Sequence, residues 1–223
     1  PRLDKDVQAA WVAEGQEIPV SDVQLSEVTV EPSKAAALTP ISRELADDSS
    51  PDAQTIVGNS MVSDIQRITD LAFLTQQSAP APQGIAALTD TTDVELDLAN
   101  LDSFSAAQFA AEGAGASLTA FLVSPDDALT LAKLKVSTGS NETLMQGQRV
   151  INGIPIIVAP SLAAGTIYGV DASRIYSVIR EDVRVDVDAS VYFTSDRLAV
   201  RTTMRLGFGF ADPASIIKMT AAA

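Results

Sequence analysis

Two aspartates, Asp186 and Asp188, are the first residues whose type and spacing could do chemistry. In the alternating stretch DVRVDVDASVYF they share one face of a strand, where two carboxylates could act as a general acid and a general base. An exposed, solvated strand face explains the same pattern. The pair is therefore a candidate for acid–base work and an equally good candidate for surface charge.

A second acidic group, in the stretch LTDTTDVELDLANLD, offers the oxygen ligands that calcium prefers. Its members are Asp90, Asp93, Glu95, Asp97 and Asp102. The spacing of an EF-hand and its central glycine are absent, and a solvated acidic loop is the alternative. The stretch EGAGAS, residues 112–117, resembles a phosphate-binding loop only in its glycines, because it lacks the GK[ST] ending.

The amino-acid inventory narrows the remaining chemistry. The chain has no histidine and no cysteine. Their absence excludes the usual catalytic triads, thiolate nucleophiles, disulfides and cysteine-ligated zinc. No catalytic residues, no cofactor site and no metal site are predicted, and the chain is predicted not to be an enzyme.

Three arginines recur at a spacing of four in DRLAVRTTMRLGFGF, residues 196–210. The neighbouring Val and Thr residues favour a strand, in which Arg197, Arg201 and Arg205 lie on one face. In so acidic a chain they suggest ion pairs with another subunit or with the acidic loops. Solvated charge is the alternative.

The bulk composition is that of a globular protein with acidic charge. The chain has 223 residues, of which 46% are hydrophobic and 20% are charged, and its formal net charge is −14. A chain of this size buries a substantial core. The negative charge argues against a nucleic-acid-binding face, and the absence of an apolar run long enough to span a bilayer predicts no membrane segment.

The elements that must position these residues indicate an α+β fold. Two strand-like stretches, 7–13 and 23–30, flank the polar segment EGQEIPVSD and predict a long hairpin; residues 34–42 continue extended. Ser49 or Ser50, then Pro51 and Asp52, form a helix-start signal. Apolar residues then recur at steps of three and four and predict a helix of roughly twenty residues or more that ends before APAPQG.

The second half of the chain mixes short helices with strands. Residues 103–112 and the stretch after Ser124 are predicted helices, and the strands are predicted at 120–124, at 153–160, within 166–179, and over 182–193 and 196–210. One long helix, several short helices and mostly non-local strands make the class α+β.

The order of these stretches resembles the major capsid proteins of tailed bacteriophages or prophages, which have the HK97-like fold. The stretches that carry the resemblance are AWVAEGQEIPVSD, PSKAAALTPISRELADDS, the long capped helix, PAPQGI, GIPIIVAPSLAAGTIYGVDASRIYSVI and FTSDRLAVRTTMRLGFGFADPASII. Each is loose alone, but their order and spacing cover nearly the whole chain.

The resemblance implies a division of the chain into four parts. These are an N-terminal remnant with the extended hairpin loop (1–31), the first part of the peripheral domain with its spine helix (32–85), the axial domain (86–175), and the returning peripheral strands with the C-terminus (176–223). In this family the extended loop leaves its own subunit and lies over a neighbour. Trp11 is therefore expected to pack at the base of the hairpin or against the neighbouring subunit, with the core of its own subunit as the alternative.

The resemblance also implies candidate interface residues, namely Trp11, Glu14, Ile18, Arg197, Arg201 and Arg205. Some relatives join subunits covalently with a loop lysine, a partner asparagine and a catalytic glutamate. Here the matching positions hold Ile18, Asp196 and Thr203. The chain is therefore expected to form no isopeptide cross-link.

The function implied is that of a structural shell protein. Copies are expected to associate through pentamers and hexamers into an icosahedral head, assembled in the host bacterial cytoplasm, that encloses double-stranded DNA without sequence-specific binding. Portal, scaffold or protease, and decoration proteins are possible partners, and no membrane is. The alternative is an encapsulin-like shell of a cellular nanocompartment.

Overall fold

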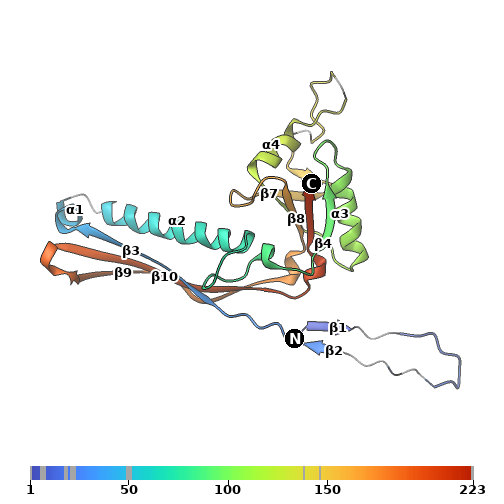
Figure 1. Ribbon diagram of the computed structural model, residues 1–223, viewed down its shortest axis with the longest axis horizontal. Helices are drawn as coiled ribbons and strands as arrows, with labels where there is room; N and C mark the ends of the chain where they lie inside the picture. The colour runs from blue at the N-terminus through green and yellow to red at the C-terminus, as the bar shows by residue number, and fades with distance from the viewer. Residues whose placement is uncertain are drawn as a thin grey trace.

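The structure, a computed structural model, describes residues 2–5, 9–17, 20, 24–48, 52–137, 139–145 and 147–221. Figure 1 shows a thin ribbon, an elongated sheet along which a long helix runs, and a second sheet that stands near the C-terminal end of that helix. None of the helices in these described parts is long and apolar enough to cross a membrane.

The ribbon consists of β1, β2 and the residues between them, and its described strand pairing lies at its base. Strand β1 (Arg2–Lys5) runs antiparallel to β2 (Gln24–Ser26), and the chain turns at Gly15, whose φ is +82°. The predicted turn in the polar segment is present, but the predicted strand is wrong for residues 9–13, which have no strand pairing. A two-stranded ribbon without a packing partner is marginal in water, which agrees with the unpaired backbone of residues 9–13.

The three-stranded sheet is antiparallel and has the order β3-β10-β9. Its strands are β3 (Ser33–Ser42), β9 (Ile175–Tyr192) and β10 (Arg197–Phe210). The short helix α1 (Arg43–Asp48) and the long helix α2 (Asp52–Leu74) follow β3. The predicted strands at 34–42 and 196–210 and the predicted long helix are confirmed; the predicted cap, Ser49 to Pro51, lies outside the described residues.

Helix α2 packs against β10 and β3. Its Met61, Ile65 and Ala72 are buried, as the spacing of apolar residues predicted. On the strand below, Phe208 contacts Phe73 of α2 with ring centroids 5.1 Å apart. Alternate residues of a strand point to opposite faces, so the even-numbered residues of β10 face the helix and the odd-numbered residues face away.

The six-stranded sheet is mixed and has the order β4-β11-β8-β5-β7-β6. Its strands are β4 (Thr92–Leu96), β5 (Ala120–Val123), β6 (Val150–Ile151), β7 (Ile154–Val158), β8 (Thr166–Val170) and β11 (Ile217–Ala221). Helix α3 (Asp102–Gly113) packs on β4 and β11, and α4 (Pro125–Lys133) packs on β7. The Ser124 side chain accepts a hydrogen bond from the Asp127 amide, so the predicted cap of α4 is confirmed.

Strand β11, near the C-terminus, belongs to the six-stranded sheet, where it lies between β4 and β8. The expected division placed the returning peripheral strands and the C-terminus together in 176–223; of this stretch, β9 and β10 lie in the three-stranded sheet and β11 does not. The reason is burial: Ile217 and Met219 are fully buried and point into the core of the six-stranded sheet. The domain boundaries stay predictions.

Both faces of the six-stranded sheet are packed. One face, with α3 and α4, buries Phe104 against Phe121 at a centroid distance of 5.1 Å. The other face buries Leu122, Tyr168 and Ile216 together with Leu74 at the end of α2. This second core is where the two sheets meet.

Candidate interaction surfaces

The ribbon is exposed over the whole of its described tip. Residues 9–17 are all exposed, and Trp11 is 106% exposed, so it does not pack against the part of the chain that the structure describes. Glu14 is exposed in the turn, and Ile18 lies outside the described residues. Residues 9–31 contain five acidic residues and no Lys or Arg, namely Glu14, Glu17, Asp22, Glu27 and Glu31. The tip therefore presents an aromatic side chain in acidic surroundings.

The base of the ribbon is seated on the three-stranded sheet. A Cβ at Gly209 would approach Cγ2 of Val30 to 2.6 Å, and a Cβ at Gly207 would approach Cγ1 of the same valine to 2.8 Å. The two glycines of LGFGF thus leave room for Val30 on the face opposite α2. The predicted strand at 23–30 is limited to β2 within the described residues, and Val30 packs without strand pairing.

That same face of the sheet, away from α2, carries a row of basic side chains from β10. Arg201 donates to Asp186 (Nη2–Oδ2, 3.0 Å), and Arg205 pairs with Glu181 (Nε–Oε2, 3.5 Å). Both acids lie on β9, so these two arginines pair within their own sheet. Arg197 has no ion pair among the described residues. The predicted alignment of the three arginines is present, whereas their role between subunits is untested.

A shallow polar groove of about 460 Å³ runs over this face. Its lining carries both signs of charge: Lys34, Glu181, Asp182, Arg184, Asp186, Arg201, Thr203 and Arg205. Arg184 also donates to Asp186 (Nε–Oδ1, 2.7 Å), so one carboxylate joins two guanidinium groups. The groove is suited to a charged peptide surface rather than to an apolar ligand.

The aspartate pair of β9 does not resemble an acid–base couple. The hydrogen bond from Arg201 is the main cause that lowers the pKa of Asp186, and a hydrogen bond from the Ser190 side chain lowers the pKa of Asp188. An acid–base pair needs two pKa values that are pushed apart, with one raised. Both carboxylates instead serve as acceptors for neighbouring donors.

The structure does not support the other two candidate sites, the acidic stretch at 88–102 and the glycine-rich stretch at 112–117. No group of three acidic side chains could hold a metal ion in the described ranges. Asp97 accepts hydrogen bonds from the Ala99 amide (2.8 Å) and the Asn100 side chain (2.8 Å), which is the geometry of a turn. The glycine-rich stretch 112–117 covers the last residues of α3 and the turn that follows it.

Two of the three positions that matter for covalent joining are described. Asp196 sits in the turn between β9 and β10 with a φ of +51°, and its carboxylate pairs with Arg43 (Oδ1–Nε, 3.0 Å). Thr203 lines the polar groove. The third, Ile18, lies outside the described residues.

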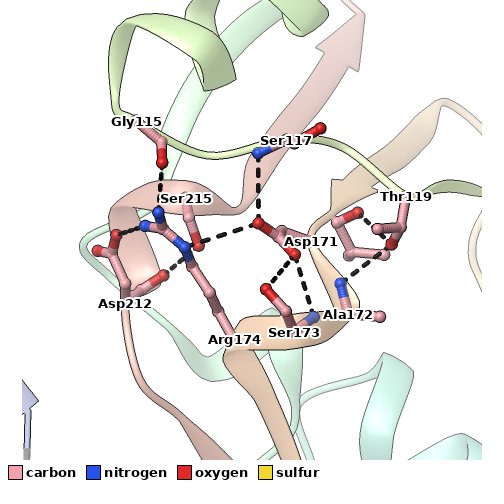
Figure 2. A network of polar contacts seen from close by, with 10 residues as sticks. Gly115, Ser117, Thr119, Asp171, Ala172, Ser173, Arg174, Asp212 and Ser215 are labelled. Carbon is pink, nitrogen blue, oxygen red and sulfur yellow. Dashed lines mark hydrogen bonds and ion pairs between the residues drawn. The ribbon is translucent and has the colours of Figure 1, made fainter.

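A further polar cluster, which the sequence did not predict, lies where the two sheets join (Figure 2). Arg174 contacts the carboxylates of Asp171 and Asp212 and the carbonyl oxygen of Gly115. Asp171 accepts a hydrogen bond from the Ser173 amide at the start of η2, and Asp212 precedes the short turn at 213–215. An aspartate followed two or three residues later by a serine is the turn signal that could have found the cluster.

Burial alone would raise the pKa of Asp171, but its partners reverse the direction. Hydrogen bonds from Ser173 and from the Ser117 amide, with the charge of Arg174, together lower the pKa of that carboxyl below its ordinary value. Asp171 is therefore ionised and fully partnered.

The chain is similar to known phage proteins over nearly its full length. The phage capsid family matches residues 1–221. A capsid polyprotein of Pseudomonas phage PAJU2 is 29% identical over 74% of this chain, which spans only 27% of that polyprotein.

Solved capsid structures share the fold. The capsid of a native GTA particle matches with a TM-score of 0.80 at 21% identity and covers 99% of this chain and 83% of its own. A structure from Mycobacterium phage Adephagia matches with a TM-score of 0.81 at 15% identity and covers 100% and 84%. The predicted α+β, HK97-like class is confirmed. The chain therefore belongs to the phage capsid family and has the fold of its members.

Proposed function

We propose that this chain is a major capsid subunit, copies of which associate through pentamers and hexamers into an icosahedral phage head that encloses double-stranded DNA. The observation that carries the proposal is the ribbon with Trp11 at full exposure. A buried tryptophan contributes a large contact area, and aromatic anchors are enriched at the centres of interfaces. A side chain of this kind held out on a ribbon calls for a partner surface outside its own subunit.

Charge supports a second copy as that partner. The ribbon holds five acidic residues and no basic ones between residues 9 and 31. The sheet face opposite α2 carries Arg197 without an ion pair among the described residues, beside Arg201 and Arg205. Complementary charges set the register and steer the approach of two surfaces. In this proposal the ribbon of one copy, with Glu14 and Ile18, lies over the arginine row of its neighbour.

The shell is held together without covalent joining. An isopeptide bond between subunits needs an amine that attacks an amide carbonyl and expels ammonia, with a carboxylate nearby to take the proton. Ile18 supplies no amine, Asp196 has no amide, and Thr203 has no carboxylate. Stability then comes from many repeated non-covalent contacts that close on themselves.

The remaining partners follow from this role. The net charge of −14 suits a container whose wall repels DNA instead of binding it. A portal, a scaffold or protease and a decoration protein are the other proteins that such a head would meet, and assembly would take place in the host cytoplasm. No enzymatic activity is proposed.

The test is the size of the particles that the protein forms. Size exclusion with light scattering and negative-stain microscopy of the same fractions should find rings or closed shells. The variant Trp11→Ala should shift the protein to free subunits, and the matched Trp11→Phe, which keeps an aromatic anchor, should retain most assembly.

Two results would contradict the proposal. Shells of normal yield from Trp11→Ala would show that the ribbon anchor is dispensable. A ladder of bands above 23.3 kDa after boiling wild-type particles in SDS would show covalent joining.

A further inference from the structure

The backbone passes directly between the six-stranded and three-stranded sheets at two places. The first crossing, η2 (Ala172–Arg174), connects β8 to β9, and the second, which contains η4 (Pro213–Ser215), connects β10 to β11. A backbone hydrogen bond from the Ala211 amide to the Arg174 carbonyl joins the crossings (2.9 Å). The relative orientation of the two sheets therefore depends on how these short segments are held.

The Arg174 side chain contacts both crossings and the turn after α3. Its guanidinium donates to Asp212 of the second crossing and to the carbonyl of Gly115, which lies in the turn between α3 and β5. The same group lies 3.6 Å from Asp171 at the start of the first crossing (Nε–Oδ2). Figure 2 shows the guanidinium between these acceptors. A planar guanidinium with five fixed donors suits such a three-way contact, and a lysine does not.

The partners of Arg174 are themselves held in place. Asp171 is 6% exposed and accepts from the Ser117 amide (3.2 Å) and from the Ser173 hydroxyl (2.6 Å). Ser215 is fully buried, and its hydroxyl donates to the Asp212 carbonyl (2.6 Å). The cluster is a rigid polar contact between the loops of one sheet and the crossings to the other.

The apolar surface at the same junction is partly open to solvent. An open, mostly apolar groove of about 430 Å³ lies beside α2. Phe73 of α2 and Phe208 of β10 line it from one side, and Leu122 and Val170 of the six-stranded sheet line it from the other. Both phenylalanines also pack against the buried second core, so apolar packing and the polar contacts of Arg174 act together at this junction.

We propose that the contacts of Arg174 with Asp171, Asp212 and Gly115 fix the angle between the two sheets. When these contacts are lost, the sheets rotate relative to one another about the two crossings. The consequence rests on the proposed shell function: a fixed angle limits the shapes that a subunit takes in a pentamer or a hexamer, and hence limits the curvature of the shell. Packed elements with a few connecting segments are the usual place for such hinge motion.

The angle can be measured in the isolated subunit. The chain has no cysteine, so spin labels can be placed through single cysteines introduced at Ile56 of α2 and Leu129 of α4, which are 65% and 53% exposed. Electron–electron resonance should give one narrow distance distribution for the wild type. The variant Arg174→Lys should broaden or split it, because an ammonium cannot hold the three acceptors together.

A matched control is the same substitution in another arginine–aspartate pair. Arg67 pairs with Asp64 within α2 (Nη2–Oδ1, 2.8 Å), away from the two crossings. Arg67→Lys should leave the distance distribution unchanged. Hydrogen exchange gives a second readout: the Ser117 and Ala211 amides should exchange about tenfold faster in Arg174→Lys, as expected for the loss of charged hydrogen bonds.

An unchanged distance distribution in a folded Arg174→Lys would contradict the proposal that Arg174 fixes the angle between the sheets. If that variant does not fold by circular dichroism, Asp212→Asn, which removes one acceptor only, takes its place with the same two expected outcomes. Particle diameters then test the consequence: one diameter for the wild type and for Arg67→Lys, and several for Arg174→Lys. A wild type that forms no shells would count against the proposed function and leave the distance measurement standing.

Discussion

The six-stranded sheet and the three-stranded sheet with its ribbon bury their apolar residues in different ways. In the first, Phe104, Phe121 and Met219 are fully enclosed by the chain itself. In the second, Ile179 and Val187 of β9 are each 55% exposed, and Trp11 of the ribbon is fully exposed. One part completes its core alone, and the other leaves apolar side chains exposed.

Strand β9 shows how this difference arises. Its sequence alternates Val183, Arg184, Val185, Asp186 and Val187, which predicts a strand with one buried face. In the register of the sheet, Val187 lies opposite Val200 and Val185 lies opposite Thr202, both on the face toward α2. Helix α2, however, packs on β10 and β3, so this apolar row lies beside the helix and not beneath it. The pattern is that of a half-buried strand whose cover is missing from the isolated chain.

The largest expected effect lies in the core of the six-stranded part. Phe104→Ala removes a fully buried ring in contact with Phe121 and should lower the free energy of unfolding by about 3–5 kcal/mol. The matched Phe109→Ala, on the same helix but 69% exposed, should change it by less than about 0.5 kcal/mol. Chemical denaturation followed by circular dichroism measures both, and equal losses would contradict a self-contained core.

The next largest loss of stability is expected at Gly84, where the loop after α2 passes close to the backbone of that helix. A Cβ at Gly84 would lie 2.1 Å from the Ala72 carbonyl oxygen, so Gly84→Ala should destabilise the fold by about 1–3 kcal/mol. Gly58, inside α2, has nothing within 4 Å of such a Cβ. Gly58→Ala should therefore stabilise it by about 0.5–1 kcal/mol through helix propensity. Thermal unfolding of the pair would refute this picture if both shifts had the same sign.

The pH dependence of stability tests the polar cluster around Asp171 and Arg174, which lies between the two sheets. The pKa of Asp171 is lowered from 3.8 in the fold, so its stabilising contribution is present above pH 3.8 and is lost as the pH falls through the lower, folded value. Asp171→Asn should cost stability at neutral pH, and the gap to the wild type should narrow below pH ~3.8. Asp64→Asn, in an exposed ion pair of α2, should differ by less than about 0.5 kcal/mol at neutral pH. A gap for Asp171→Asn that is constant with pH would contradict the assignment.

A smaller gain in stability is expected at Thr202, on the face of β10 toward α2. The Thr202 hydroxyl is fully buried and has no hydrogen-bond partner among the described residues. Thr202→Val keeps the shape and removes the orphaned oxygen, and should raise the free energy of unfolding by about 1 kcal/mol. Thr203→Val, half-buried on the opposite face, should be close to neutral. Urea titration of both variants would contradict this view if Thr202→Val were the less stable.

Local patterns predicted much of this fold, because they arise from neighbouring residues. The spacing from Met61 to Ala72 predicted α2, and the Ser124 cap predicted α4, since both signals act within a few residues. The Val and Thr residues within 196–210 predicted β10, and the spacing of four predicted the common face of its arginines. The α+β class followed from the order of these elements.

Features that depend on contacts distant in sequence could not be predicted in this way. The place of β11 in the six-stranded sheet could not be predicted, because its pairing with β4 and β8 joins residues far apart in the chain. The partners of Arg201 and Arg205 depended on the register of β9, which bulges shift. The cluster around Arg174 brings together Gly115, Asp171 and Asp212, and only the folded topology places them side by side.

The emission of Trp11 tests the central claim most directly, because it is the chain's only tryptophan. Fluorescence and acrylamide quenching should be compared between isolated subunits and purified particles of the same protein. If the ribbon packs on a neighbouring copy, emission shifts to shorter wavelength and quenching falls when particles form. Emission and quenching that are the same in subunits and in particles would contradict the claim that a neighbour buries the ribbon.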